Sequence, residues 1–291
     1  MKTMVLDIGG TAIKSAVYED GSLIDIQETP TEAWLGGNHV VKRAEEILFS
    51  YKKKYSFDRI GISTAGQVDS ATGTIIYANK NIPGYTGTKL KNIFEEDFCL
   101  PTAVENDVNA AAIGEAVFGA GQNKENFACL TYGTGVGGAM FLRGSLYSGS
   151  SYSAGEFGAI VTHPEDRCPQ KDMFSGCYEQ YASVTALVRR AKELDPSLSD
   201  GRILFRHLGE PSVAHLIDEW IMEIVYGLVT ITHMLNPSCI ILGGGIMEQD
   251  YVLEHVQKKL YEHIMPSFRN VKIKKAALGN RAGMLGAAVI R

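Results

Sequence analysis

Two segments rich in glycine and threonine are the first candidates for chemistry in this sequence of 291 residues. Asp7-Ile8-Gly9-Gly10-Thr11 lies between two apolar runs, and Thr131-Tyr132-Gly133-Thr134-Gly135-Val136-Gly137-Gly138 has the same setting further along the chain. Glycine lets the backbone approach an anion closely, and a threonine hydroxyl adds a hydrogen-bond donor. The carboxylate of Asp7 cannot hold phosphate, but it can hold the water shell of Mg²⁺. The two segments together predict a site that grips a polyphosphate.

A third segment, Glu105-Asn106-Asp107-Val108-Asn109-Ala110, follows a predicted strand and begins a predicted helix. An aspartate at a helix start is most often an N-cap. Polar side chains at such a junction also form binding sites at the edge of a sheet. In a closed cleft beside a sugar hydroxyl, an aspartate can act as a general base. Asp107 is therefore the candidate catalytic residue.

Two further segments offer surfaces for a ligand. Gly243-Gly244-Gly245 follows a buried strand and leaves a flat surface suited to a ring or a ribose. The alternative interpretation of these glycines is a tight turn between a strand and a helix. Glu156 and Glu179 lie in glycine-containing loops, where they could accept hydrogen bonds from vicinal hydroxyls. For these two residues the alternative interpretation is a solvated surface acid.

The elements that must position these residues follow an α/β pattern. Strands are predicted at residues 3–8, 12–18 and 23–29, a helix at 37–55, and long helices at 178–194 and 212–235. The order of strand, glycine-rich turn and strand near the N-terminus returns at residues 127–142, so we expect an internal repeat of topology. Trp34 and Trp220 are expected in the core.

One long uncharged stretch, Val225–Met247, is long enough to span a bilayer. Asn236-Pro237 and Gly243-Gly244-Gly245 interrupt it, which predicts a buried helix, a turn and a buried strand instead. We therefore expect no membrane association.

Composition narrows the function classes. The 28 basic and 33 acidic residues give a net charge of -5, so no basic patch for nucleic acid is indicated. Five scattered cysteines make a disulfide framework improbable, and the N-terminus shows no signal peptide. We expect a cytoplasmic protein.

In this order and spacing, the five segments resemble the ROK family of sugar kinases and repressors, from about Met4 to Ala288. The resemblance implies the two-lobed α/β fold of actin and hexokinase (ribonuclease H-like), with the ATP and sugar cleft between the lobes. We expect an N-terminal lobe of residues 1–118 plus about 280–291, and a C-terminal lobe of residues 119–279. The resemblance also implies ATP as phosphoryl donor, Mg²⁺, a hexose or hexoside substrate and a homodimer.

The family's functional residues can be carried over where this sequence matches. Asp107 would take the proton of the sugar hydroxyl. The residues implied for sugar binding are Gly66, Asn81, Asn106, Asp107, Glu156 and Glu179. Asp7 would sit near Mg²⁺, and the other residues assigned to nucleotide binding are Gly9, Gly10, Thr11, Lys14, Gly133, Thr134, Gly135, Gly243, Gly244 and Gly245.

The sequence departs from the family where many members bind zinc. Ala159 stands where those members have a histidine, and of the cysteine motif only Cys177 is in register, with Cys168 displaced. We expect no zinc, although His163, Cys168 and Cys177 could form a three-ligand site. The missing histidine also leaves room near the anomeric end of the sugar. This favours a hexose substituted at that end, such as a β-glucoside.

The expected function is therefore ATP-dependent phosphorylation of glucose or a β-glucoside, at the sixth hydroxyl that the family usually modifies. N-acetylmannosamine kinase and fructokinase remain alternatives, as does a sugar sensor without catalysis on the same fold. ROK repressors carry a helix-turn-helix before the first phosphate segment. The first strand here is expected at about residue 3, which leaves no room for one.

Overall fold

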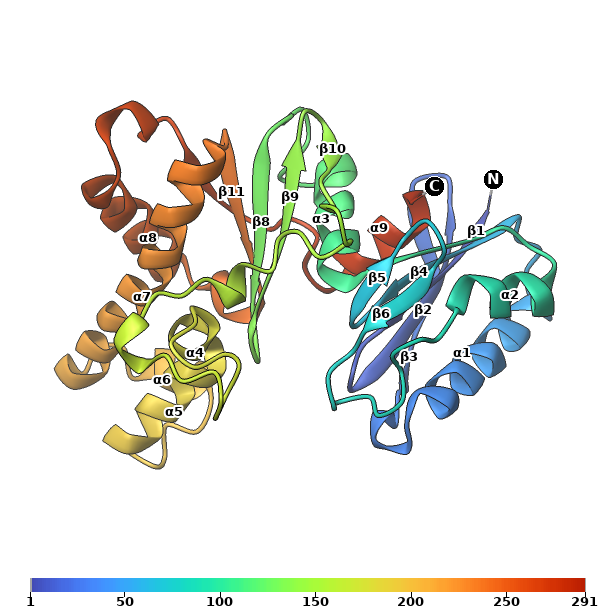
Figure 1. The fold of residues 1–291 in the computed structure, drawn as a ribbon, viewed down its shortest axis with the longest axis horizontal. Helices are drawn as coiled ribbons and strands as arrows, with labels where there is room; N and C mark the ends of the chain where they lie inside the picture. Colours follow the sequence, from blue (N-terminus) through green and yellow to red (C-terminus); the bar gives the residue numbers. More distant parts are fainter. Residues whose placement is uncertain (1, 291) are drawn as a thin grey trace. The chain divides into compact units, whose positions relative to one another are not determined.

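The computed structural model describes residues 2–290, which divide into two compact α/β units. Unit 1 extends to Gln122 and adds Ser148–Ala154 and the residues from Asn280 onward, whereas unit 2 comprises Asn123–Tyr147 and Gly155–Gly279. The C-terminal helix, red in Figure 1, thus returns to the unit that contains the first strand.

Unit 1 is built on a five-stranded sheet in the order β3-β2-β1-β4-β7. The strands are β1 (Thr3–Ile8), β2 (Ala12–Glu19), β3 (Ser22–Pro30), β4 (Arg59–Thr64) and β7 (Thr102–Asn106). β1, β2 and β3 form an antiparallel meander, and β4 and β7 continue from β1 in parallel. The carboxyl ends of β1, β4 and β7 therefore meet at one edge of the sheet, where Asp7, Ser63 and Asn106 lie.

Helices cover both faces of this sheet (Figure 1). α1 (Gly37–Lys52) and α2 (Leu90–Phe98) pack on Met4, Leu6 and Ile8, while Val5 on the opposite face contacts the cluster of α9 (Ala282–Val289). This alternation is the period of two expected for a strand buried on both faces. α3 (Asp107–Phe118) approaches α9 closely, and a Cβ at Gly114 would lie 2.6 Å from the Ala282 carbonyl oxygen. A small hairpin of β5 (Gln67–Asp69) and β6 (Thr74–Tyr77) completes the unit.

Unit 2 repeats the sheet, in the order β10-β9-β8-β11-β12. Its strands are β8 (Phe127–Tyr132), β9 (Val136–Leu142), β10 (Ser145–Leu146), β11 (Cys239–Gly243) and β12 (Lys272–Lys275). β8 pairs antiparallel with β9 and parallel with β11, as β1 does with β2 and β4. The predicted repeat of topology is confirmed.

The helices of unit 2 cluster on Leu130, Tyr132 and Leu242 in one large core that includes the fully buried Trp220. They are α4 (Glu179–Ala182), α5 (Val184–Leu194), α6 (Gly201–Arg206), α7 (Pro211–Leu235) and α8 (Asp250–His263). The predicted helix, turn and strand of the uncharged stretch are confirmed, because α7 ends at Leu235 and β11 begins at Cys239. Within residues 2–290, no helix combines the length and apolarity needed to cross a membrane.

Two expectations from the sequence were wrong. The single helix predicted over residues 178–194 breaks at Ser183, whose extended backbone and side chain cap α5 by accepting from the Ala186 amide at 3.2 Å. Serine favours such caps over helix interiors, which explains the break. Trp34 is 73% exposed rather than in the core, because it sits in a 3₁₀ turn (Ala33–Leu35) beyond the sheet.

Candidate active site

Asp107 is the first residue of α3 and directly follows the last residue of β7. Its Oδ1 accepts from the Val108 amide and from Asn106 Nδ2, each at 2.9 Å. Asn106 is the N-cap, and its Oδ1 accepts from the amides of Val108 and Asn109 at 2.9 and 3.1 Å. The local sequence thus builds a capped helix start that holds the Asp107 carboxyl in one orientation.

The side-chain amide of Asn106 also contacts the loop after β4, where Nδ2 donates to the Gly66 carbonyl oxygen at 2.8 Å. Gly66 has φ 97°, and a Cβ there would lie 2.8 Å from the Tyr77 carbonyl oxygen. Both hydrogens of the amide are therefore engaged, one by Gly66 and one by Asp107. Asn106 orients Asp107 in this structure, and a sugar contact by Asn106 stays a prediction.

Asp7 lies beside Lys14 and Ser63 in the strand register. Its Oδ1 accepts from Ser63 Oγ at 2.7 Å, and its Oδ2 lies 3.5 Å from Lys14 Nζ. The carboxyl is also packed against α9, since a Cβ at Gly283 would lie 2.8 Å from Oδ1. Asp7 is thus fixed in place with partly buried oxygens at the sheet edge.

The pKa of Asp107 is raised from 3.8 to about 6, chiefly by burial and next by the negative charge of Asp7. Burial also raises the pKa of Glu105, whose Oε1 accepts from Asn109 Nδ2 at 3.0 Å. Two carboxylates that repel each other favour a cation or a proton at this end of the sheet. A general base works best with a pKa near the operating pH, and Asp107 meets that condition.

The first glycine turn joins β1 to β2. The Gly9 amide donates to the Ala12 carbonyl oxygen at 3.0 Å, and Thr31 Oγ1 donates to the Gly9 carbonyl oxygen at 2.7 Å. Gly10 and Thr11 are exposed at its tip. Of the predicted sugar residues in unit 1, Asn81 is exposed on the loop that follows β6.

The second glycine turn joins β8 to β9 in unit 2. It is closed by a hydrogen bond from the Gly133 amide to the Gly135 carbonyl oxygen at 3.0 Å, and Gly133 and Thr134 are exposed. The Gly133 carbonyl oxygen accepts from the Val184 amide at 3.0 Å, which ties the turn to the start of α5.

A large cavity of about 1460 Å³ adjoins this turn. Gly133, Thr134 and Gly245 line it, together with apolar side chains such as Val188 and Phe205. Its charged lining residues are Arg189, Lys192, Glu193, Asp200, Arg202, Arg206 and Glu248. The cavity is large enough for a nucleotide, with an apolar wall for a base and cations for phosphates.

The three consecutive glycines divide their roles. Gly243 ends β11 and is buried, whereas Gly245 is exposed on the cavity. Gly244 has φ 103°, and a Cβ there would collide with the Tyr132 carbonyl oxygen. Gly244 therefore lets the strand turn tightly beneath the second glycine turn, and Gly245 supplies the flat surface.

Glu179, which is predicted to bind the sugar, lies beside the second glycine turn, which is predicted to bind the nucleotide. Its Oε2 lies 3.4 Å from the Val136 amide and 2.6 Å from the position that a Cβ of Gly135 would take. Burial raises the pKa of the Glu179 carboxyl. The preceding residue, Tyr178, is fully buried and is bonded through its hydroxyl to Tyr132 at 2.7 Å. Glu156, at the other end of the same loop, is exposed.

Of the residues considered for zinc, His163 has other partners and Cys177 is buried. His163 Nε2 lies 3.5 Å from Glu223 Oε2, and its ring stacks on Tyr181 with centroids 3.7 Å apart. Cys177 is buried, and burial raises the pKa of its thiol. Across the described chain, no three histidine, cysteine or acidic side chains are grouped to hold a metal ion. The donor set at this loop does not fit zinc.

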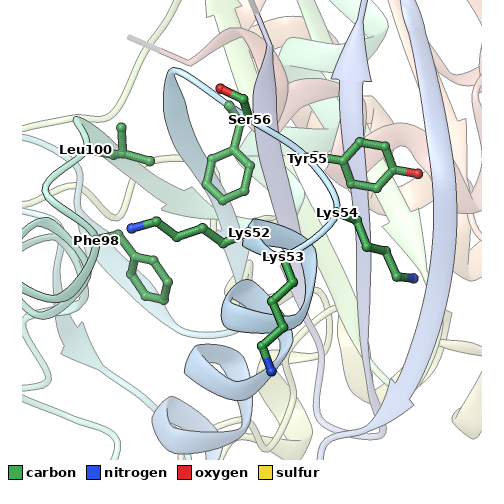
Figure 2. Close-up of a pocket in the computed structure, with 8 residues that line it drawn as sticks. Lys52, Lys53, Lys54, Tyr55, Ser56, Phe98 and Leu100 are labelled. Atoms are coloured by element: carbon green, nitrogen blue, oxygen red, sulfur yellow. The ribbon is translucent and has the colours of Figure 1, made fainter.

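A second cavity, of about 460 Å³, lies at the C-terminal end of α1 and is shown in Figure 2. Lys52, Lys53 and Lys54 line it, but their side chains diverge. Lys52 extends over the ring of Phe98 at 5.5 Å, and Lys54 lies 3.4 Å from Asp25. A set of diverging lysines at a helix end is typical of a solvated surface, so this cavity is not part of the candidate site.

Several structural contributors could not be found from motifs. Ser63 supports Asp7, and Tyr132 and Tyr178 fix the base of the second turn. The cavity residues on α5 and α6 carry no motif. Ser63 could have been anticipated from its place at the end of a strand next to Thr64-Ala65-Gly66. The others depend on tertiary packing.

The repeated sheets, with carboxylates at the edge of one and a nucleotide-sized cavity beside the other, are typical of the actin and hexokinase fold. The model of the ROK family matches residues 3–291. A glucokinase of Streptomyces coelicolor is 33% identical, over 98% of this chain and 96% of its own length. A beta-glucoside kinase of Listeria innocua is 32% identical, over 99% of this chain and 96% of its own length.

A solved structure gives the same result. The ROK glucokinase of Streptomyces griseus, in complex with glucose and AMPPNP, matches with a TM-score of 0.84 and 29% identity, over 99% of this chain and 98% of that one. The chain belongs to the ROK family, and the relatives that resemble it here are sugar kinases.

Proposed function

We propose that this ROK protein is an ATP-dependent sugar kinase that uses Asp107 as its general base. The observation that carries the proposal is Asp107 itself, oriented by Asn106 and the Val108 amide and given a pKa of about 6. At neutral pH such a carboxyl is mostly ionised, yet basic enough to accept a proton. A carboxylate used only as an N-cap needs no raised pKa, since its partners favour the charged form.

In the proposed reaction, the sugar hydroxyl gives its proton to an Asp107 carboxylate oxygen as its own oxygen attacks the γ-phosphorus of ATP. The bond from that phosphorus to the bridging oxygen breaks, and ADP leaves with the electron pair. The protein contributes mainly positioning and charge neutralisation to such a transfer. Asn106 and the first turn of α3 perform the positioning of Asp107.

The nucleotide is assigned to the two glycine turns and the unit 2 cavity. The exposed backbone of Gly10 and Thr11 in unit 1, and of Thr134 in unit 2, would donate to phosphate oxygens. Gly133, whose amide closes the second turn, would let the phosphates approach its backbone. Gly9, Lys14, Gly135 and the Gly243–Gly245 turn support these surfaces. The apolar part of the cavity would take the adenine ring.

The carboxyl of Asp7 fits Mg²⁺, because it is fixed by Ser63 and adds negative charge beside Asp107. Mg²⁺ usually keeps several waters and takes one or two carboxylates together with substrate phosphates. When bound there, it would neutralise charge on the phosphates. Asp7 would hold that ion through its water shell.

For the sugar, we propose glucose or a β-glucoside, bound by Gly66, Asn81, Asn106, Glu156 and Glu179 and phosphorylated at the sixth hydroxyl. The residue Ala159 favours a sugar that is substituted at its anomeric end. It is an exposed methyl side chain three residues after Glu156, in the position where the family pattern has histidine. The relatives named glucokinase and beta-glucoside kinase are similar to this chain to nearly the same degree. N-acetylmannosamine and fructose are the alternative substrates.

The test is ADP release from MgATP with glucose, cellobiose, N-acetylmannosamine, mannose, fructose or no sugar. We expect turnover with glucose or cellobiose, and cellobiose preferred if the space at Ala159 accepts a second ring. Restoring the histidine with Ala159→His should then shift preference toward glucose. If no sugar supports turnover while sugars still raise the melting temperature, the sugar sensor is the correct function.

A further inference from the structure

The chain between Glu156 and Glu179 leaves the body of unit 2 as a loop whose two ends are tied together. Val161 and Cys177 form an antiparallel bridge, and the Tyr178 amide donates to the Ile160 carbonyl oxygen at 2.7 Å. The Gly176 carbonyl oxygen accepts from the amides of Thr162 and His163 at 3.1 and 3.0 Å. The two carboxylates assigned to the sugar thus flank one closed loop.

The side chain of Arg167 holds the interior of this loop. Its Nη1 donates to the carbonyl oxygens of Met173 and Ser175 at 2.6 and 2.9 Å. Next to it, the Cys168 amide donates to Ser175 Oγ at 2.7 Å. One guanidinium therefore joins the outgoing arm of the loop to the returning arm, which leads directly into Gly176, Cys177, Tyr178 and Glu179.

The returning arm passes close to the outgoing arm at Gly176. Gly176 has φ 68°, and a Cβ there would lie 3.2 Å from the Arg167 amide nitrogen and would collide with the His163 carbonyl oxygen. The charge of Arg167 also reaches Cys177, where it opposes the rise in thiol pKa that burial causes. Arg167 therefore contacts, through its side chain, backbone and charge, the segment that ends in Glu179.

We propose that Arg167 is a positioning residue that closes this loop and sets the place of Glu179 relative to Glu156, in place of a zinc ion. The inference rests on the proposed function, because it assigns those two carboxylates to the sugar. His163, one of the three ligands that a zinc site in this loop would need, contacts Glu223 and Tyr181 instead. A planar guanidinium is suited to the task, because it can donate to two carbonyls in fixed directions.

The test compares Arg167→Met, Arg167→Lys and the control Lys171→Met, an exposed cation in the same loop. The readouts are kcat, the KM for the sugar, the KM for ATP and the melting temperature. We expect Arg167→Met to raise the sugar KM by about 10- to 100-fold, since a misplacement near 1 Å has effects of that size. The ATP KM should change less than about threefold, Arg167→Lys should recover part of the loss, and Lys171→Met should match the wild type.

A second readout does not depend on activity. Trypsin should cut at Lys171 faster in Arg167→Met than in the wild type, because the loop is no longer closed. If Arg167→Met does not fold, Arg167→Lys carries both readouts, since an ammonium cannot donate to two carbonyls in the same geometry.

Two results with Arg167→Met would overturn the proposal: an unchanged sugar KM together with an unchanged rate of cleavage, or an equal rise in the KM for the sugar and for ATP. A loss of sugar affinity in the wild type on addition of a zinc-selective chelator would also overturn it. If the wild type phosphorylates no sugar, the proposed function fails, and the rate of cleavage at Lys171 alone decides whether Arg167 closes the loop.

Discussion

The two sheets share one topology but differ at the same edge, where each has a glycine turn. In unit 1, the fifth residue of β1 is Asp7, with Lys14 and Ser63 on the neighbouring strands. In unit 2, the fifth residue of β8 is Thr131, with Gly137 and Gly243 in the corresponding places.

This difference suits the two sheets to the different tasks that we propose for them. Unit 1 gathers charged side chains at the edge, where Asp7 raises the pKa of Asp107. Unit 2 has glycines at the same edge, and the backbone at Gly133 and Gly245 is exposed beside the large cavity. Carboxylates suit proton transfer and a metal ion, whereas bare backbone suits the binding of phosphates and a flat ring. The comparison predicts that acid–base chemistry depends on unit 1 side chains and nucleotide binding on unit 2 backbone.

The largest effect is expected for Asp107→Asn. Removing the base should lower kcat by about 10²- to 10⁴-fold, the usual contribution of general base catalysis. The amide oxygen can still accept from the Val108 amide, so the sugar should continue to raise the melting temperature. The matched control is Asp20→Asn, which changes an exposed aspartate at φ 49°, a conformation that asparagine tolerates. Wild-type turnover in Asp107→Asn would remove Asp107 from the base role.

In unit 2, alanine substitutions should distinguish the role of Gly135, beside Glu179, from that of Gly133, at the nucleotide cavity. Gly135→Ala places a Cβ 2.6 Å from Glu179 Oε2, so Glu179 must move. We expect the sugar KM to rise by about tenfold, equivalent to about 1.4 kcal/mol of lost binding. Within the described residues, a Cβ at Gly133 meets no atom closer than 4 Å, so Gly133→Ala should change the KM for ATP more than that for the sugar. Equal effects of the two variants on the sugar KM would contradict the placement of Glu179.

The pair Gly244→Ala and Gly245→Ala tests stability in the same way. Gly244 has φ 103° and no space beside the Tyr132 carbonyl, so alanine should lower the free energy of unfolding by at least about 1–3 kcal/mol. A Cβ at Gly245 has open space around it among residues 2–290, and Gly245→Ala should leave the urea midpoint of the apoprotein nearly unchanged. Equal midpoints for the two variants would show that the turn relaxes without cost.

The sequence was informative where chemistry is local. The two glycine turns, the strand end before Asp107 and the uncharged helix could all be predicted, because each depends on residues adjacent in the chain. The place of Ser63 at a strand end is visible in the sequence, but its contact with Asp7 is not, because that contact arises from the parallel pairing of strands and joins residues 56 positions apart. The same holds for Arg167, whose side chain bonds backbone carbonyls that carry no sequence signature. The helix break at Ser183 was missed because serine caps and serine interiors look alike in a periodic pattern.

The last predictions concern the pH dependence of activity and stability, in which Asp107 of unit 1 is compared with Glu179 of unit 2. Below about pH 6, kcat/KM should fall tenfold per unit as Asp107 becomes protonated, because only its ionised form can accept the sugar proton. The stability effect has the opposite direction. A carboxyl with a raised pKa binds more protons in the folded than in the unfolded state, so its contribution to stability declines as the pH rises from about 3.8 to about 6.

Asp107→Asn should therefore melt a few degrees above the wild type at pH 8, and this gain should vanish below about pH 4. Thermal unfolding of the two apoproteins across that range measures the difference directly. Glu179→Gln in unit 2 is the comparison, because burial also raises the pKa of that carboxyl, the Val136 amide lowers it, and the charges of Glu156 and Asp172 add to the rise. If the Asp107→Asn gain at pH 8 is smaller in an Asp7→Asn background, the charge of Asp7 contributes to the raised pKa of Asp107. An unchanged gain would assign the whole shift to burial.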